Sequence, residues 1–117
     1  MEAKLKNQGE VTIVTLEGSL DIEKTQPFRE ACIKHLLNKK VIFNMENVTF
    51  VGSTGLQAFL ETIRLMSEEG MHGLKVVGVR AEFKRIFMNL EFQKLQFHES
   101  DATAVESFKA SNLPPII

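Results

Sequence analysis

The segment from residue 41 to residue 66 constrains the fold most strongly. Residues 41–45 read Val-Ile-Phe-Asn-Met, an almost continuous apolar run that is typical of a parallel strand covered on both faces. A short Gly/Ser/Thr stretch follows at 52–55. Apolar residues then recur at the spacing of one helix face, namely Leu56, Phe59, Leu60, Ile63 and Met66. A buried strand, a tight turn and an amphipathic helix in this order predict part of an α/β protein.

The rest of the chain continues this alternation of strands and helices. Residues 4–17 predict a β-hairpin with its turn at 7–10 and a β-branched second strand at 11–16. Residues 18–21 then break the strand. A first helix is predicted to start near Thr25 and Pro27, and it buries Phe28, Ala31, Cys32, His35 and Leu36. A second helix over about 54–69, a strand at 74–79, a third helix around 83–90 and a strand at 95–98 follow. A last helix is capped by Ser100 and Asp101 and buries Ala104, Val105 and Phe108.

These elements predict one α/β domain over residues 1–112. We expect a mixed, mostly parallel sheet of four to five strands with about four helices, opening with a β-hairpin. Residues 113–117, Leu-Pro-Pro-Ile-Ile, cannot continue a helix, so we expect a loose C-terminal tail. In open α/β sheets, function tends to lie at the loops that leave the carboxyl ends of the strands, which points to residues 18–21 and 51–55.

The charge balance argues against two classes of main partner. The 117 residues hold 14 Lys and Arg against 15 Asp and Glu, whereas nucleic acid and anionic membranes favour a basic excess. No apolar run approaches the ~20 residues of a membrane span, and residues 1–6 lack the apolar core of a signal peptide. One cysteine, Cys32, excludes an intramolecular disulfide and suits a reducing compartment. We therefore expect a cytoplasmic protein.

The residue patterns of common catalytic sites are absent. Residues 52–57 lack the lysine and the loop length of a phosphate-binding P-loop. They also lack the Gly-x-Ser-x-Gly of a nucleophile elbow, because Gly52 directly precedes Ser53. The three histidines, His35, His72 and His98, are far apart and have no metal-site spacing. We therefore expect no catalysis, no cofactor and no metal.

The hydroxyl residues at the predicted start of the second helix carry the strongest functional signal. A helix N-terminus exposes unpaired N–H groups and the positive end of the helix dipole, and it is a natural place for an anion. A hydroxyl there can bind a phosphate, accept a phosphoryl group or simply cap the helix. Ser53 and Thr54 occupy this position, and these interpretations remain open at this point.

Four segments in order resemble the STAS domain of bacterial anti-sigma-factor antagonists. Residues 16–21 resemble the Gly-x-Leu-Asp loop of that family, and residues 41–51 resemble its hydrophobic strand, short turn and Val-x-Phe-Val stretch. Residues 53–56, Ser-Thr-Gly-Leu, match its signature, and residues 74–79 match its next strand. The resemblance covers nearly the whole chain and implies a small non-catalytic sheet domain.

The resemblance also implies a phosphorylation switch. In that family the unphosphorylated domain binds an anti-sigma factor that is also a serine kinase, and so frees the sigma factor. The kinase then phosphorylates the first serine of the signature, and the complex dissociates. By position that serine is Ser53, with Thr54 as second choice. A serine phosphatase is a further candidate partner.

On this resemblance we expect the partner to contact one surface around the signature. Its predicted members are Ser19, Asp21, Gly52, Ser53, Thr54, Gln57 and Arg64. The chain departs from the family at two positions, because Gly52 and Asn44 stand where the family usually has Asp. These departures keep an alternative open, in which the chain is a non-catalytic STAS scaffold subunit of a membrane transport or stress-signalling complex and is not phosphorylated on serine.

Overall fold

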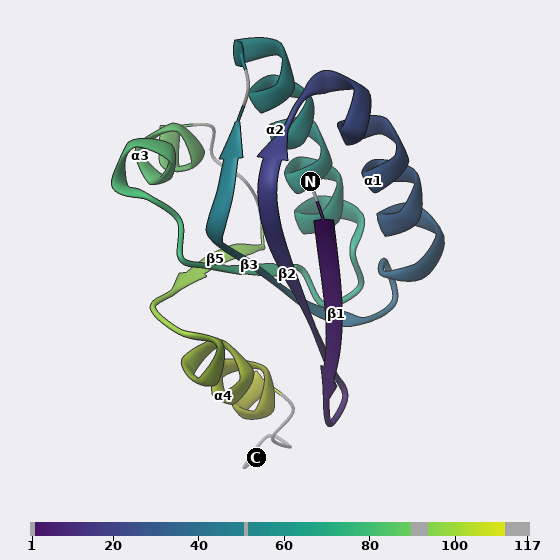
Figure 1. Ribbon diagram of the computed structural model, residues 1–117. Coiled ribbons are helices and arrows are strands. Elements are labelled where there is room, and N and C mark those ends of the chain that lie inside the picture. Colours follow the sequence, from purple (N-terminus) through teal and green to yellow (C-terminus); the bar gives the residue numbers. More distant parts are fainter. Residues whose placement is uncertain (1, 51, 90–93, 112–117) are drawn as a thin grey trace.

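The computed structural model describes residues 2–50, 52–89 and 94–111, with the backbone alone at residues 22, 50, 52, 53, 82, 89, 110 and 111. A mixed five-stranded sheet is combined with four helices in the described part of the chain (Figure 1). The elements are β1 Glu2–Gln8, β2 Val11–Leu20, α1 Ile22–His35, β3 Lys40–Phe50, α2 Gly52–Glu69, β4 Leu74–Val77, α3 Ala81–Asn89, β5 Leu95–His98 and α4 Asp101–Ser111. The predicted fold class is confirmed.

The chain opens with the predicted hairpin. β1 pairs antiparallel with β2, and Gln8 lies opposite Val11, so Gly9 and Glu10 form a two-residue turn. Gly9 has a φ of 62°, the positive value that tight hairpin turns require at their first central position. The turn is therefore shorter than the predicted stretch at 7–10.

The strand order explains where the helices lie. The strands follow one another across the sheet as β1-β2-β3-β4-β5, and β2 to β5 are all parallel. Right-handed crossovers that always step in one direction place their helices on one face. α1, α2 and α3 accordingly pack into one core with that face, whereas α4 packs on the other. In Figure 1 α1 and α2 run side by side along the sheet.

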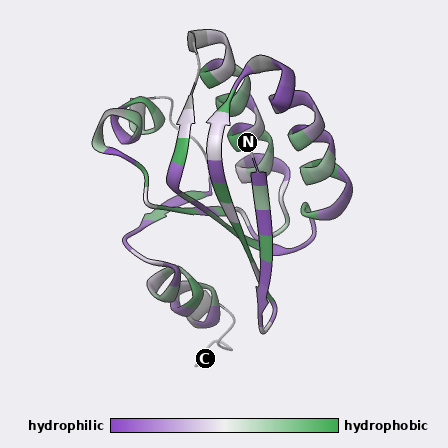
Figure 2. Cartoon of the chain, in the orientation of Figure 1, coloured by the Kyte–Doolittle hydropathy of each residue, from purple (hydrophilic) through white to green (hydrophobic). Residues whose placement is uncertain are grey.

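Two apolar cores follow from this layering. The larger core joins alternate residues of the central strands to the three crossover helices, with Phe43, Phe59 and Phe87 fully buried. The smaller core lies under α4 and contains Val11, Ile13, Ile42, Val77, Ala104, Val105 and Phe108. Hydrophilic and hydrophobic residues alternate along the helices (Figure 2), as expected for helices that lie between a sheet and solvent.

β2 and α1 differ from the predicted boundaries. β2 continues through the predicted break to Leu20, because residues 17–20 still pair with β3. α1 then begins at Ile22, three residues before the predicted start, and Pro27 lies inside the helix. Its buried residues are Thr25, Phe28 and Cys32, and the buried C-cap Leu36 follows them, whereas Ala31 and His35 are exposed. The prediction that Ala31 and His35 face the core was wrong.

β3 is one long strand and not a short strand followed by a turn. Between Thr15 and Glu17 of β2, the partner residues on β3 advance from Asn44 to Asn47, which marks a β-bulge. The extra residue changes the alternation of side chains: Phe43 and Met45 face the helices before the bulge, and Val48 faces them after it. The turn predicted within residues 41–51 is therefore a bulge.

The C-terminal predictions are confirmed where the structure describes them, except that Asp101 is the first residue of α4 and not part of its cap. β5 spans Leu95–His98, and Ala104, Val105 and Phe108 on α4 are buried. The hydroxyl of Ser100 accepts a hydrogen bond from the backbone N–H of Thr103 at 3.2 Å, so Ser100 caps α4. The predicted loose tail at 113–117 lies outside the described residues.

Candidate functional site

The candidate site lies at the carboxyl ends of β2 and β3. These strands lead into the N-termini of α1 and α2, which meet at the top of Figure 1. The β1–β2 turn and α4 lie at the opposite end of the sheet. The sequence pattern placed the candidate residues at this carboxyl edge, and the strand directions agree.

α2 begins ahead of both candidate hydroxyls. The helix starts at Gly52, two residues before the predicted start near residue 54. Ser53 and Thr54 therefore both belong to its first turn, and Ser53 does not precede the helix as that prediction required. Thr54 is exposed, and the predictions on the side chain of Ser53 lie outside the described residues. The first turn holds no acidic residue, so no carboxylate within it offsets the positive end of the helix dipole.

Gly55 lets this first turn lie directly against the end of β2. A Cβ at Gly55 would lie 3.1 Å from the carbonyl oxygen of Leu20 and 3.3 Å from the Cα of Asp21. Both are backbone atoms, which cannot rotate out of the way as a side chain can. Glycine in the Ser-Thr-Gly-Leu segment therefore joins two of the predicted site segments, residues 18–21 and 51–55.

Asp21 has a structural role at this junction. Its carboxylate accepts a hydrogen bond from the backbone N–H of Lys24 at 3.0 Å, and it is the N-cap of α1. The hydroxyl of Thr25 donates to the backbone carbonyl of Asp21 at 2.8 Å. Asp21 is half-buried; its carboxylate is held at the N-terminus of α1, and its backbone lies against Gly55 in the first turn of α2.

Ser19 lies on the other face of the sheet. Leu20 is buried among the crossover helices, and side chains alternate along a strand, so Ser19 points away from them. Its hydroxyl lies 3.2 Å from that of Thr49 on β3, and both residues are exposed. The structure therefore brings Asp21 to the first turn of α2 but places Ser19 on a different face.

The polar stripe along α2 contains a residue that was not predicted. Gln57 and Arg64 are exposed, and Arg64 pairs with Glu68 at 3.8 Å. Arg64 is ten residues beyond Thr54, roughly 15 Å along the axis. Glu61 lies between them and pairs with Arg29 of α1 at 3.9 Å. The sequence analysis missed Glu61, although its spacing of four from Gln57 and three from Arg64 indicated the same face.

Asn44 has a structural explanation. Its amide nitrogen donates to a carboxylate oxygen of Asp101 at 3.1 Å, and its amide oxygen accepts from the backbone N–H of Glu46 at 3.1 Å. Asn44 thus ties the β3 bulge to the start of α4. An aspartate here would set two carboxylates against each other. Asn44 therefore differs from the usual Asp at a position that contacts α4, and neither of these two hydrogen bonds involves the first turn of α2.

The described residues offer no reactive thiol or metal cluster at this edge. Cys32 is fully buried on α1, and burial raises the pKa of its thiol to about 12, so it stays protonated at neutral pH. Within the described ranges, no group of three or more His, Cys, Asp or Glu residues is placed to hold a metal ion. No described helix has the length and apolar character needed to cross a membrane.

Residues 2–106 match the STAS domain family. This chain belongs to that family. The match includes the hairpin, the Ser-Thr-Gly-Leu segment and residues 101–106 of α4, so the sheet and its three crossover helices form a STAS fold. A search of curated protein sequences found no match.

Solved structures share this STAS fold at low sequence identity. The anti-sigma factor antagonist SpoIIAA in its unphosphorylated form is 18% identical, with a TM-score of 0.63 over 92% of this chain and 98% of that chain. The Bacillus cell fate determinant SpoIIAA in the phosphorylated form gives 17% identity and a TM-score of 0.61 over 92% and 99%. An anti-sigma factor antagonist from Mycobacterium paratuberculosis gives 16% identity and a TM-score of 0.64 over 92% and 93%.

A membrane transporter also contains a similar fold. The murine Slc26a9 anion transporter is 19% identical over the matched part, with a TM-score of 0.65. The match covers 90% of this chain but 18% of the transporter chain. The STAS fold therefore occurs both as a small protein and as part of a much larger one.

Proposed function

We propose that this STAS protein is an anti-sigma-factor antagonist switched by phosphorylation of Ser53. In its unmodified state it sequesters an anti-sigma factor that is also a serine kinase, and so frees a sigma factor. Phosphate on Ser53 ends the complex, and a serine phosphatase restores binding. This role needs no catalysis by the chain itself and places it in the cytoplasm with its partner.

The observation that carries the proposal is the position of the signature segment. Ser53 belongs to the first turn of α2, at the carboxyl edge of the sheet, and Gly55 packs that turn against the Leu20–Asp21 backbone. The neighbouring residue Thr54 is exposed. The similarity to SpoIIAA, which has been solved in phosphorylated and unphosphorylated forms, supports the same role here.

The physical basis of the switch is a difference between the free and bound states. A phosphoserine carries about −1.5 to −2 charges, and a helix N-terminus stabilises a negative charge by roughly 0.3–1 kcal/mol. The free domain therefore tolerates the phosphate. A partner docked over the same turn would bury that charge without a counter-ion, which costs several kcal/mol.

Incubation with a purified anti-sigma serine kinase and ATP tests the proposal. The intact mass of the chain should rise by one phosphate, and Ser53→Ala should abolish the rise. Thr54→Ala is the matched control, because it removes the neighbouring hydroxyl and should leave the rise intact. Phosphate on neither Ser53 nor Thr54 would contradict the proposed switch.

A second candidate function is a STAS scaffold in a membrane transport or stress-signalling complex. The fold similarity to part of an anion transporter favours it, as does Gly52 in place of the acidic residue usual in the antagonists. In this case the chain should co-purify with a membrane transporter and stay unmodified in the kinase experiment. Asn44 does not support this candidate, because its contacts explain its presence.

A further inference from the structure

Two adjoining hollows lie at the end of the sheet opposite to the candidate site. They have volumes of about 790 and 300 Å³, and both are lined by Lys40 and His72. Lys40 is the first residue of β3, and His72 comes just before β4. β3 runs from here to the edge where α2 begins, in ten steps of about 3.3 Å or roughly 30 Å in total.

The smaller hollow is strongly basic, and we call it the basic groove. Lys40, Lys75 and Lys94 line it, together with His72, and no carboxylate is among the described residues of its wall. Lys40 is 6% exposed and Lys75 4% exposed. Outside this wall, Glu10 pairs with Lys40 at 2.9 Å from an 83% exposed position in the larger hollow.

Lys75 is buried without a counter-charge from the described residues. Its ammonium donates to the amide oxygen of Gln96 and, at 2.8 Å, to the hydroxyl of Ser107. It also lies 4.6 Å from the centre of the Phe108 ring. These partners are neutral, and burial lowers the pKa of Lys75. A buried charge paired only with neutral groups costs stability, so the fold alone would favour an apolar residue here.

The three ammonium groups retain donors for a ligand. Each lysine has three N–H donors, and the described hydrogen bonds use two on Lys75, one on Lys40 and one on Lys94. Lys94 also has a φ of 57°, a strained conformation for a residue with a side chain, and such strain tends to occur at functional sites.

We propose that the basic groove binds a small phosphorylated molecule, with its phosphate between Lys40, Lys75 and Lys94. Three cations and no lining carboxylate suit a polyvalent anion better than a single carboxylate. The other walls are Met71, Leu74 and Phe108, which suit an apolar or aromatic part of the same ligand. The groove lies at the far end of the sheet from Ser53, so this proposal is independent of the proposed switch.

Titration of the ¹⁵N-labelled chain with inorganic pyrophosphate at constant ionic strength tests this proposal. Amide shifts should saturate and should cluster at residues 38–40, 71–75 and 94–96. Lys75→Met should weaken binding about tenfold or more, because it removes a buried charged donor. Without pyrophosphate, the melting temperature of Lys75→Met should equal or exceed that of the original chain.

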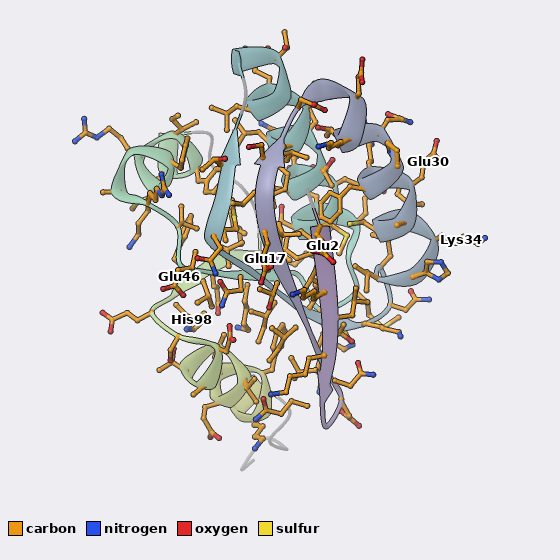
Figure 3. The ribbon with its side chains drawn as sticks, in the orientation of Figure 1. Glu2, Glu17, Glu30, Lys34, Glu46 and His98 are labelled. Atoms are coloured by element: carbon orange, nitrogen blue, oxygen red, sulfur yellow. The ribbon has the colours of Figure 1, made fainter. Side chains whose placement is uncertain are left out.

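Matched variants keep the test decisive. Lys94→Gln removes an exposed groove lysine and should also weaken binding, which covers the case that Lys75→Met fails to fold. Lys34→Gln removes an equal charge from the outer side of α1, where Figure 3 shows Lys34 pointing away from the sheet, and should leave binding unchanged. Shifts that sodium chloride reproduces, shifts confined to α2, or equal weakening by Lys34→Gln would overturn the proposal.

Discussion

Gly55 determines how closely α2 approaches the end of β2. We expect Gly55→Ala to destabilise the domain by about 1 kcal/mol or more, because its Cβ would press on backbone atoms at 3.1 and 3.3 Å. In an exposed helix the same change stabilises by up to about 1 kcal/mol. Urea unfolding measures the change in stability, and its sign therefore shows whether Gly55 contacts the backbone of Leu20 and Asp21.

Thr54→Ala is the control for this measurement. It changes an exposed neighbour in the same turn, so it alters helix propensity without creating a new contact. Its stability should stay within about 0.5 kcal/mol of the original. A stabilising effect of Gly55→Ala would show that α2 is not held against Leu20 and Asp21.

His98 makes stability depend on pH. It lies half-buried on β5, near the start of α4 (Figure 3). Burial and the nearby charge of Lys75 lower its pKa below the ordinary 6.5. As pH falls below about 6.5, the unfolded chain therefore binds a proton that the folded chain does not. Stability should be full above pH 6.5 and should fall as pH drops through the folded pKa.

The variant His98→Asn should lose less stability than the original chain between pH 7 and pH 5. Each unit of difference in pKa is worth about 1.4 kcal/mol, and urea unfolding at several pH values measures the difference. His35→Asn, at an exposed position on α1, is the control for removal of a histidine. Identical pH profiles of stability for His98→Asn and the original chain would contradict the claim that His98 causes the pH dependence.

At the scale of elements, Asp21 links α1 to the candidate site. Asp21→Ala should destabilise the domain by about 1 kcal/mol, because it removes the N-cap bond to Lys24. Asp21→Asn keeps a good capping side chain and should retain stability while removing the charge. Thermal unfolding separates the two variants, and equal losses would show that the carboxylate charge, not the cap, is what matters.

Elements with strong local signals could be predicted from the sequence. Ala104, Val105 and Phe108 on α4 have clear helical spacing behind the Ser100 cap, and all are buried as predicted. The hairpin and β5 were likewise evident. In these segments local preference and tertiary packing agree, which is the condition under which pattern analysis succeeds.

Elements decided by long-range pairing could not be predicted in detail. Gly18 and Ser19 read as a break, but pairing with Val48 and Thr49 keeps them in β2. The bulge in β3 changes which side chains face the core, and no local pattern shows it. At the candidate site, the sequence predicted that the Ser-Thr-Gly-Leu segment and Asp21 lie at one edge of the sheet, where their backbones are in contact, but it did not show that Ser19 lies on the other face.

At the scale of the whole molecule, the sheet separates two ends with different chemistry. The carboxyl edge joins the first turn of α2 to Asp21 by close backbone contact. The opposite end gathers Lys40, Lys75 and Lys94 in one groove. The described surface thus provides separate places for a protein partner, as proposed, and for a small anion.

The central claim is that negative charge at Ser53 removes the partner and leaves the domain folded. The most direct measurement compares the affinity of Ser53→Asp and Ser53→Asn for the anti-sigma factor by calorimetry, together with their melting temperatures. The two side chains are nearly equal in size and differ in charge. We predict that Ser53→Asp binds at least about tenfold more weakly at a closely similar melting temperature. Equal affinities, or unfolding of Ser53→Asp alone, would contradict the switch.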